Sequence, residues 1–398
     1  MNEINKPRFV FINLQETNFL VTTYYSIKNG WKVKTFKHRF LLDYLIQNGY
    51  EIINYIIPGK APIEDVKKEC EIVYDANGLT NLVTNIFDDK LIKKTDILIV
   101  YFHYYDQYLA GQKVDCFKVC MGNHFIRVDG QHDLAKDGYD VFVNEVDLSE
   151  NEFVNYYFNV SGVENVLCPY IFADRFIEKV PFSSRKNKAM AVGTLSTCEG
   201  LPDYDCYRKY FKTDWIQPMR YEIWKNKRNL KDIDCYISYI YEGVWRIKDT
   251  DNFFIKILKK IYNKLHRRQG KYTSFDMVDK FNEYKMFICP EELVGMPGIG
   301  FVEGMACGTA YIGLKDKMYE CLGLIPDYHY ITYDGTLSDL EKKVSYYESH
   351  PKELETIAAN GTKFVRDHFN SKKVSDDFFK KILKLEESRW NQKYLLWT

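Results

Sequence analysis

The stretch Glu283–Gly313, EYKMFICPEELVGMPGIGFVEGMACGTAYIG, decides the fold of this chain. It opens with a short apolar run, Met286–Cys289, which ends at a proline and predicts a buried strand. A loop with two glutamates and three glycines follows. Phe301–Cys307 then has the pattern of a short helix with an acid in its first turn and a glycine stop. Ala310–Gly313 predicts the next strand, so the stretch forms a βαβ crossover, the unit of a parallel sheet.

The loop in the middle of this crossover has a chemistry of its own. Glycines let the backbone approach a ligand closely, and the free amides at a helix start attract a phosphate. A neighbouring carboxylate can accept hydrogen bonds from the paired hydroxyls of a ribose or a hexose. A ligand that places a phosphate on the amides and sugar hydroxyls on the carboxylate would be a nucleotide-sugar. An ordinary βα turn, in which glycine only makes the bend, fits the same spacing.

The stretch resembles the donor-binding segment of retaining, nucleotide-sugar-dependent glycosyltransferases of the GT-B fold, the group 1 or E-x7-E type. The family motif is an acidic residue, seven residues and a glutamate, followed by a helix of small residues. Glu303 matches the second glutamate, and Pro297-Gly298-Ile299 matches the tripeptide that donates amides to the ligand. The resemblance extends these amide donors to Gly300 and Phe301.

The first acidic residue of the motif is where this sequence departs from the family. Gly295 stands eight residues before Glu303, where the family has a glutamate. Glu292 or Glu291 takes that role only if the loop is three or four residues longer. We assign the contact with the donor sugar to Glu292, and we expect Glu303 to bind the ribose.

Length and composition limit the possible classes of protein. The 398 residues are enough for two domains, each with its own core. The 55 basic and 55 acidic residues give zero net charge, so no general basic field indicates a nucleic-acid partner. The ten cysteines form no CxxC or Cys/His cluster, which argues against a zinc site or a disulfide framework. No signal peptide and no apolar run of about 18 residues is found, so we expect a cytoplasmic protein.

Strands that alternate with helical segments predict a doubly wound parallel sheet in each half of the chain. The expected strands of the N-terminal half are Phe9–Leu14, Glu51–Ile57, Asp96–Phe102, Phe117–Met121, Val141–Asn144 and Asn165–Cys168. We predict an N-terminal acceptor-side domain over 1–168, a linker over 169–188 and a C-terminal donor-binding domain over 189–375. The last helix, within 376–398, is expected to pack back on the N-terminal domain. The fold class is thus α/β, with two Rossmann-like domains facing a central cleft, as in GT-B enzymes.

The resemblance implies further site residues outside the opening stretch. In the family a histidine after an N-domain strand faces the donor, and His124 resembles it best, with His103 and His132 as alternatives. A departing nucleoside diphosphate needs positive charge. The family's Gly-Arg after the first C-domain strand is Gly193-Thr194 here, so we expect Thr194 at the donor.

The missing arginine needs a replacement. We expect Arg220 to supply the positive charge, with Lys285 or Lys227 behind it. No metal is expected, because no Asp-x-Asp triad follows a strand. The sequence Asp203-Tyr204-Asp205 has that spelling but lies among turn residues.

Residues 253–271, FFIKILKKIYNKLHRRQGK, form an amphipathic basic segment. Its apolar residues fall on one helical face, and seven lysines and arginines stand among them without an acid. This pattern is typical of a helix lying on anionic lipid. A packed helix with a solvated basic face has the same pattern.

The sequence therefore predicts a glycosyltransferase of the hexosyltransferase type. It would move a sugar from a nucleotide-sugar to a glycan or a lipid-linked acceptor in surface polysaccharide biosynthesis, with retention and without metal. It would be cytoplasmic or at the inner face of the membrane. Two other functions fit the same architecture: a nucleotide-sugar epimerase that needs no acceptor, and an inactive nucleotide-sugar-binding subunit.

Overall fold

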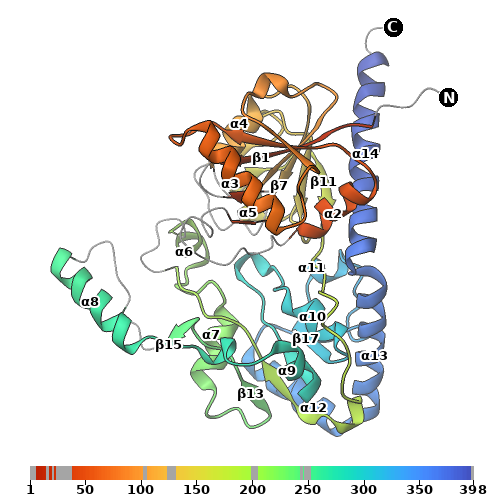
Figure 1. Ribbon diagram of the computed structural model, residues 1–398. Coiled ribbons are helices and arrows are strands. Elements are labelled where there is room, and N and C mark those ends of the chain that lie inside the picture. Colours follow the sequence, from red (N-terminus) through yellow and green to blue (C-terminus); the bar gives the residue numbers. More distant parts are fainter. Residues whose placement is uncertain are drawn as a thin grey trace. The chain divides into compact units, whose positions relative to one another are not determined.

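The computed structural model of the chain describes residues 6–14, 18–19, 22–23, 38–101, 105–122, 131–198, 205–242, 245 and 252–395. Its contacts divide it into two compact units (Figure 1). Unit 1 comprises Met1–Cys168 together with Ser371–Thr398, and unit 2 comprises Pro169–Asn370. The segment 169–188, which the sequence suggested as a linker, therefore belongs to unit 2, and the return to unit 1 begins at Ser371.

Unit 1 is built on a seven-stranded parallel sheet in the order β11-β9-β7-β6-β1-β4-β5. The strands are β1 (Phe9–Leu14), β4 (Ile52–Ile57), β5 (Val83–Ile86), β6 (Ile97–Tyr101), β7 (Phe117–Met121), β9 (Val141–Asn144) and β11 (Glu164–Leu167). The helices are α2 (Arg39–Gln47), α3 (Ile63–Ala76), α4 (Tyr105–Gln112), α5 (Glu152–Tyr157) and α14 (Ser371–Leu395). Two short pairs complete the unit: β2 (Asn18–Phe19) with β3 (Thr22–Thr23), and β8 (His132–Asp133) with β10 (Phe158–Asn159).

The strand order follows from the central position of β1. The first strands after it, β4 and β5, lie on one side, and β6, β7, β9 and β11 follow on the other. This is the order of a doubly wound Rossmann-like sheet. The inner strands are buried on both faces because helices cover both faces, which is why their sequences are largely apolar.

The last helix, α14, completes the core of unit 1. Its Phe379 stacks on Tyr44 of α2, with ring centroids 4.8 Å apart, and packs edge-on against Phe9 of β1 at 5.3 Å. Further along the helix, Arg389 donates to the carbonyl of Cys116 at 2.7 Å and to the carboxylate of Asp140 at 3.1 Å. The final segment of the chain is therefore part of the first unit.

Unit 2 contains a five-stranded parallel sheet in the order β13-β12-β16-β17-β18. The strands are β12 (Lys186–Ala191), β13 (Ile233–Cys235), β16 (Tyr284–Ile288), β17 (Ala310–Leu314) and β18 (Ile331–Tyr333). The helices are α6 (Asp205–Phe211), α7 (Pro218–Asn226), α8 (Phe253–His266), α9 (Met277–Glu283), α10 (Gly300–Ala306), α11 (Lys317–Glu320), α12 (Leu337–Ser349) and α13 (Pro351–His368). An antiparallel pair, β14 (Tyr241–Glu242) with β15 (Arg268–Gln269), precedes α9.

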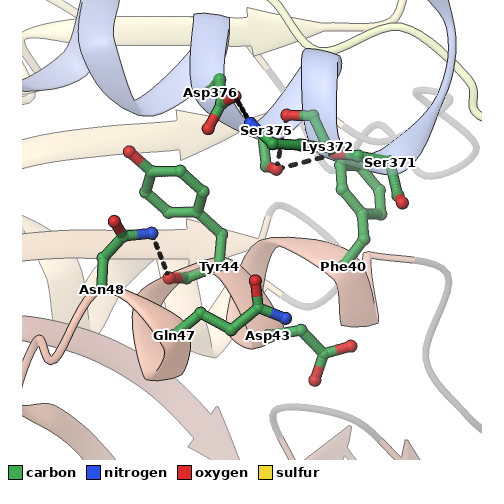
Figure 2. Close-up of a pocket in the computed structure, with 9 residues that line it drawn as sticks. All are labelled: Phe40, Asp43, Tyr44, Gln47, Asn48, Ser371, Lys372, Ser375 and Asp376. Carbon is green, nitrogen blue, oxygen red and sulfur yellow. Dashed lines mark hydrogen bonds and ion pairs between the residues drawn. The ribbon is translucent and has the colours of Figure 1, made fainter.

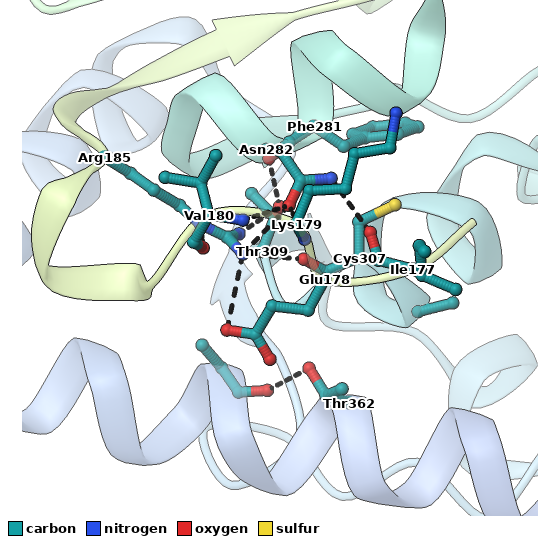
Figure 3. A network of polar contacts seen from close by, with 12 residues as sticks. Ile177, Glu178, Lys179, Val180, Arg185, Phe281, Asn282, Cys307, Thr309 and Thr362 are labelled. Atoms are coloured by element: carbon teal, nitrogen blue, oxygen red, sulfur yellow. Dashed lines mark hydrogen bonds and ion pairs between the residues drawn. The ribbon is translucent and has the colours of Figure 1, made fainter. Parts of the chain in front are cut away.

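The crossover expected from the opening stretch is present in unit 2 as β16, α10 and β17. Short α10 is fixed at its C-terminal end by two arginines. Arg185 donates to the carbonyl of Cys307 at 2.9 Å and to the hydroxyl of Thr309 at 3.0 Å (Figure 3). Arg366 donates to the carbonyl of Ala306 at 2.6 Å. Cations at the C-terminal carbonyls stabilise a helix through its dipole. Figure 3 also shows that Arg185 contacts Glu178, so this network holds the start of unit 2 against the rest of the unit.

Candidate functional site

The strand order of unit 2 reverses between β12 and β16. β13 lies on one side of β12, and every later strand of the sheet lies on the other side of it. In open α/β sheets, ligands bind outside the carboxyl ends of the strands at such a switch point. The loops at this place are Val192–Thr194 after β12 and Cys289–Ile299 after β16, and the second is the glycine loop of the opening stretch.

Arg220 joins these two loops. It lies in the first turn of α7, is 5% exposed, and donates from Nε to the carbonyl of Pro290 at 2.9 Å. Its Nη1 donates to the carbonyl of Thr194 at 3.2 Å. In the described part of the chain its ion-pair partner is Glu292, with Nη1 and Oε1 3.9 Å apart. A buried guanidinium with so distant a carboxylate gains from a further anion at the same place.

Two glycines give Arg220 its space. Gly193 has a φ of 142°, and a Cβ at this position would lie 2.8 Å from Nε of Arg220. A Cβ at Gly298 would lie 3.1 Å from Nη2 of Arg220 and 3.3 Å from the sulfur of Cys289. The backbone of both loops thus approaches the guanidinium as closely as only glycine allows.

Glu292 belongs to a second connection at the same edge. Its Oε1 accepts a hydrogen bond from the amide of Gln217 at 3.1 Å, and the oxygen of Gln217 accepts from the amide of Ser196 at 3.0 Å. The neighbouring Leu293 donates its amide to the carbonyl of Ile216 at 2.7 Å. The carboxylate of Glu292 is therefore held at the strand ends, beside Arg220.

The glycine loop contains a strained residue. Val294 has a φ of 77°, and Gly295 after it also has a φ of 77°. A left-handed conformation is a genuine outlier for a β-branched residue and costs on the order of 1–3 kcal/mol. Such strain persists only where the surroundings impose it, and it is found mostly at ligand-binding sites.

The amides of this loop differ from the prediction in two positions. Pro297 has no backbone N–H, so it cannot donate to a ligand. Phe301 donates its amide to the carbonyl of Gly298 at 3.1 Å, and its fully buried ring packs on Tyr311 and other aromatic rings. Within the described residues, no acceptor is found for the amides of Gly298, Ile299 and Gly300, so these three remain of the amide donors that were predicted.

Glu303 projects from α10 into a poorly solvated environment. Burial raises the pKa of this carboxyl from 4.5 to about 7, against a smaller lowering by Arg175. Burial raises the pKa of the Tyr272 hydroxyl to about 12. The charges of Cys289 and Glu303 raise this pKa further, and the charge of Arg220 lowers it. Glu303, Tyr272 and Arg220 are therefore electrostatic neighbours at the carboxyl edge of the sheet.

Glu291, the alternative to Glu292, points the other way. It is 5% exposed, and its Oε1 accepts hydrogen bonds from the amide of Leu314 at 3.0 Å and from the hydroxyl of Tyr319 at 2.5 Å. Tyr311 and Tyr333 lie at 3.4 Å from its two oxygens. Burial raises the pKa of this carboxyl. Glu291 therefore closes a polar cluster inside the core and does not face the loop.

The remaining predicted residues have different outcomes. Thr194 contributes its carbonyl to Arg220 and forms a bridge with Ser238. Lys285 is not brought to the site: it stands near the start of β16, and its ammonium group lies 5.8 Å from the ring centroid of Phe182. His124, like His103, lies outside the residues that the structure describes.

Two residues of the site were not selected from the sequence, Gln217 and Tyr272. Gln217 stands directly before Pro218, which opens α7, and this signal of a helix start marks the end of a loop where site residues gather. Tyr272 has no such signal. It reaches the site because the chain returns to the sheet after α8.

A separate pocket of about 480 Å³ lies in unit 1, between α2 and α14 (Figure 2). Its walls include Phe40, Tyr44, Lys372 and Asp376. The charge of Lys372 is already paired with Asp376 at 2.6 Å. The pocket lies on a surface between helices and not at the strand ends, so the switch point of unit 2 is the stronger candidate.

The described residues include no group of three or more His, Cys, Asp or Glu side chains placed to hold a metal ion. Independence from metal stays a prediction, to be tested by chelation.

Comparison with protein families finds one that the C-terminal region resembles. Residues 245–380 match the family described as glycosyl transferase-like. This part of the chain is similar to glycosyl transferases of that family. The match includes the glycine loop, Glu303 and Tyr272, while Arg220, Gln217 and the loop Val192–Thr194 lie outside it. The comparison with curated proteins gave no match.

Solved structures extend the likeness to the whole chain. The structure of HepE from Anabaena with UDP and glucose has a TM-score of 0.52 and 9% identity, over 95% of this chain and 100% of that chain. HepE with UDP-glucose gives the same TM-score and identity, over 95% and 99%. A glycosyltransferase from Rickettsia africae covers 96% and 99%, at a TM-score of 0.49 and 12% identity. At these identities the HepE likeness shows the fold: the predicted class, two Rossmann-like α/β units as in GT-B glycosyltransferases, is confirmed.

Proposed function

We propose that this protein is a glycosyltransferase that takes its sugar from a nucleotide-sugar, and that the switch point of unit 2 binds this donor. The observation that carries the proposal is the buried guanidinium of Arg220, set between the two loops at the strand ends with Glu292 as its distant partner. A diphosphate supplies the anion that this cation lacks, and a planar guanidinium suits phosphate oxygens. The glycosyl transferase-like match over 245–380 supports the same reading.

The other residues of the site bind different parts of the donor. Glu303 binds the ribose hydroxyls, and Glu292 contacts the donor sugar from its position beside Arg220. The amides of Gly298, Ile299 and Gly300 bind sugar or phosphate oxygens. His124 stands beside the reacting carbon. Because HepE was solved with UDP and with UDP-glucose, a UDP-sugar is the first donor to test.

In the proposed reaction the bond between the anomeric carbon and the leaving phosphate oxygen breaks. A bond from that carbon to an acceptor hydroxyl oxygen forms on the same face, and the hydroxyl proton leaves with the nucleoside diphosphate. Arg220 stabilises the charge that develops on the leaving phosphate, so that no metal ion is required. The acceptor is a glycan or a lipid-linked glycan of surface polysaccharide biosynthesis, reached from the inner face of the membrane.

The test is a calorimetric titration of the full chain with UDP, GDP and the corresponding nucleosides. We expect a diphosphate to bind at least about tenfold more tightly than its nucleoside, and Arg220→Ala to remove that difference. Lys225→Ala is the matched control, because it removes an exposed cation from the same helix. Diphosphate binding that is equal in the Arg220 variant and the control would refute the site.

Turnover then separates the proposed function from its rivals. Release of nucleoside diphosphate that depends on an added glycan acceptor supports transfer. A rearranged sugar-nucleotide formed without acceptor would instead show an epimerase, and donor binding without any turnover would show an inactive binding subunit.

A further inference from the structure

The segment between β14 and β15 is an arm that leaves the sheet of unit 2. The antiparallel pair Tyr241–Glu242 with Arg268–Gln269 forms its base, and α8 forms its body. Figure 1 shows α8 projecting away from the strands of unit 2. Asn252 caps the helix by accepting from the amide of Ile255 at 2.9 Å, and Trp245 stacks on Tyr262 of the helix at 4.2 Å.

The apolar face of this helix is uncovered. None of its residues is buried. Its large aliphatic and phenyl side chains are between 39% and 75% exposed: Phe253, Phe254, Ile255, Ile257, Leu258, Ile261 and Leu265. Phe254, Leu258, Ile261 and Leu265 follow one another at helical spacing and form one stripe. A packed helix would bury this stripe, so the alternative of an ordinary surface helix on its own unit does not describe α8.

The opposite face is basic. Lys256, Lys259, Lys260 and Lys264 fall on the side away from the stripe, at about 100° per residue, and Arg267 and Arg268 follow the helix. The helix itself, FFIKILKKIYNKLH, contains no acid. The arm therefore combines a phenyl- and leucine-rich stripe with a dense positive face.

We propose that α8 docks on an anionic phospholipid bilayer, lying in the plane of the surface with the stripe of Phe254, Leu258, Ile261 and Leu265 inserted among the acyl chains. The lysines on the polar face then meet the headgroups, and Trp245 with Tyr262 lies at the interfacial depth that such rings prefer. A helix of 14 residues is about 21 Å long, too short to cross the hydrocarbon core, so it lies on the membrane. In the described part of the chain, no helix combines the length and hydropathy of a membrane span.

Charge decides between a bilayer and a second copy of the chain. Pairing two arms through their stripes would bring two acid-free, lysine-rich helices together, and their like charges repel. An anionic bilayer offers both an apolar interior and opposite charge at the right depth. The docking does not depend on sugar transfer, so a chain that binds vesicles but transfers no sugar would overturn the proposed function and leave the docking intact.

The arm is fixed at its root, so docking has a defined orientation for unit 2. Gly270 is buried there, and a Cβ on it would lie 1.8 Å from the carbonyl oxygen of Tyr239. Two residues on, Tyr272 donates its amide to the hydroxyl of Ser238 at 3.0 Å, and Lys271 donates to the carbonyl of Cys235 at 2.7 Å. The arm thus joins the sheet directly beside β13.

The test is co-sedimentation of the full chain with phosphatidylcholine vesicles that contain or lack phosphatidylglycerol. We expect binding to the anionic vesicles that weakens at least tenfold at high salt, because surface charges are screened. Two variants should each lose at least tenfold: Phe254→Ser with Leu258→Ser and Leu265→Ser, and Lys259→Gln with Lys260→Gln and Lys264→Gln. All six side chains are partly or largely exposed, so unchanged melting temperatures are expected to show that both variants fold.

The matched control removes the same charge from another helix. Lys380→Gln with Lys381→Gln and Lys384→Gln changes three exposed lysines of α14 and should leave vesicle binding unchanged. Equal binding by the α8 variants and this control would overturn the docking. Salt-independent dimers that the serine variant abolishes, without vesicle binding by the parent chain, would assign the stripe to a second copy and also overturn it.

Discussion

Glu303 is the residue whose replacement tests the donor site most directly, because its stability effect and its binding effect have opposite signs. Burial raises the pKa of its carboxyl from 4.5 to about 7. Below pH 4.5 the carboxyl is protonated in both the folded and the unfolded chain, so its ionisation does not change the free energy of unfolding. Between pH 4.5 and 7 the unfolded chain loses this proton while the folded chain keeps it, so the free energy of unfolding falls as pH rises.

The size of this cost follows from the two pKa values. Each pKa unit of difference is worth about 1.4 kcal/mol, so the cost reaches about 3.5 kcal/mol and levels off above pH 7. Glu303→Gln removes the ionisation. We therefore expect the variant to have the same stability as the parent near pH 4.5 and to be more stable by up to about 3.5 kcal/mol at pH 8. Urea unfolding across this pH range measures the difference, with the exposed Glu355→Gln as control.

Nucleotide binding should change in the opposite direction. An ionised carboxylate accepts hydrogen bonds from two vicinal ribose hydroxyls, so affinity should rise as Glu303 ionises between pH 6 and pH 8. Glu303→Ala should weaken nucleotide binding by at least about tenfold, or about 1.4 kcal/mol, in calorimetric titrations, and the pH dependence should disappear. An unchanged dissociation constant in the alanine variant would refute the ribose role, whatever its effect on stability.

Three further outcomes are expected. Gly298→Ala places a Cβ 3.1 Å from Nη2 of Arg220, so it should weaken nucleoside diphosphate binding about tenfold in titrations and leave nucleoside binding unchanged; equal loss for both ligands would contradict this. Glu291→Ala leaves the hydroxyl of Tyr319 and the amide of Leu314 without their acceptor, so it should lower the free energy of unfolding by about 3 kcal/mol in urea while the refolded variant still binds nucleotide. Chelation with EDTA should leave turnover nearly unchanged, and activity restored by Mg²⁺ or Mn²⁺ after chelation would show that a metal holds the diphosphate.

The sheet of each unit could be predicted from the sequence because its strands are buried on both faces. Largely apolar runs such as Phe9–Leu14 and Val141–Asn144 are typical of strands buried on both faces, and the structure has strands with these bounds. The edge strand β5 was missed, since its sequence, VTNI, has two polar residues and no distinctive period.

The candidate site could be predicted only in part, because it depends on contacts between distant segments. Spacing placed two adjacent glutamates in the loop, but successive residues of an extended chain point to opposite sides, and only packing decides that Glu291 enters the core. Lys285 directly precedes the predicted strand Met286–Cys289 and lies near the start of β16, so it stands at the amino end of this strand and not at the carboxyl end, where the site lies. Tyr272 reaches Arg220 through tertiary structure alone.

Unit 1 is made of two segments of the chain that are separated by the whole of unit 2. This arrangement affects how the unit can fold during synthesis. A ribosome completes residues 169–370, all of unit 2, before it makes α14. Domains usually fold in the order in which they are synthesised. Unit 1 therefore begins to emerge before unit 2 but lacks part of its core for longer, because Phe9 and Tyr44 remain without the ring of Phe379 until α14 is made. A nascent or truncated chain therefore presents this aromatic surface to chaperones and to other chains, and the final helix withdraws it.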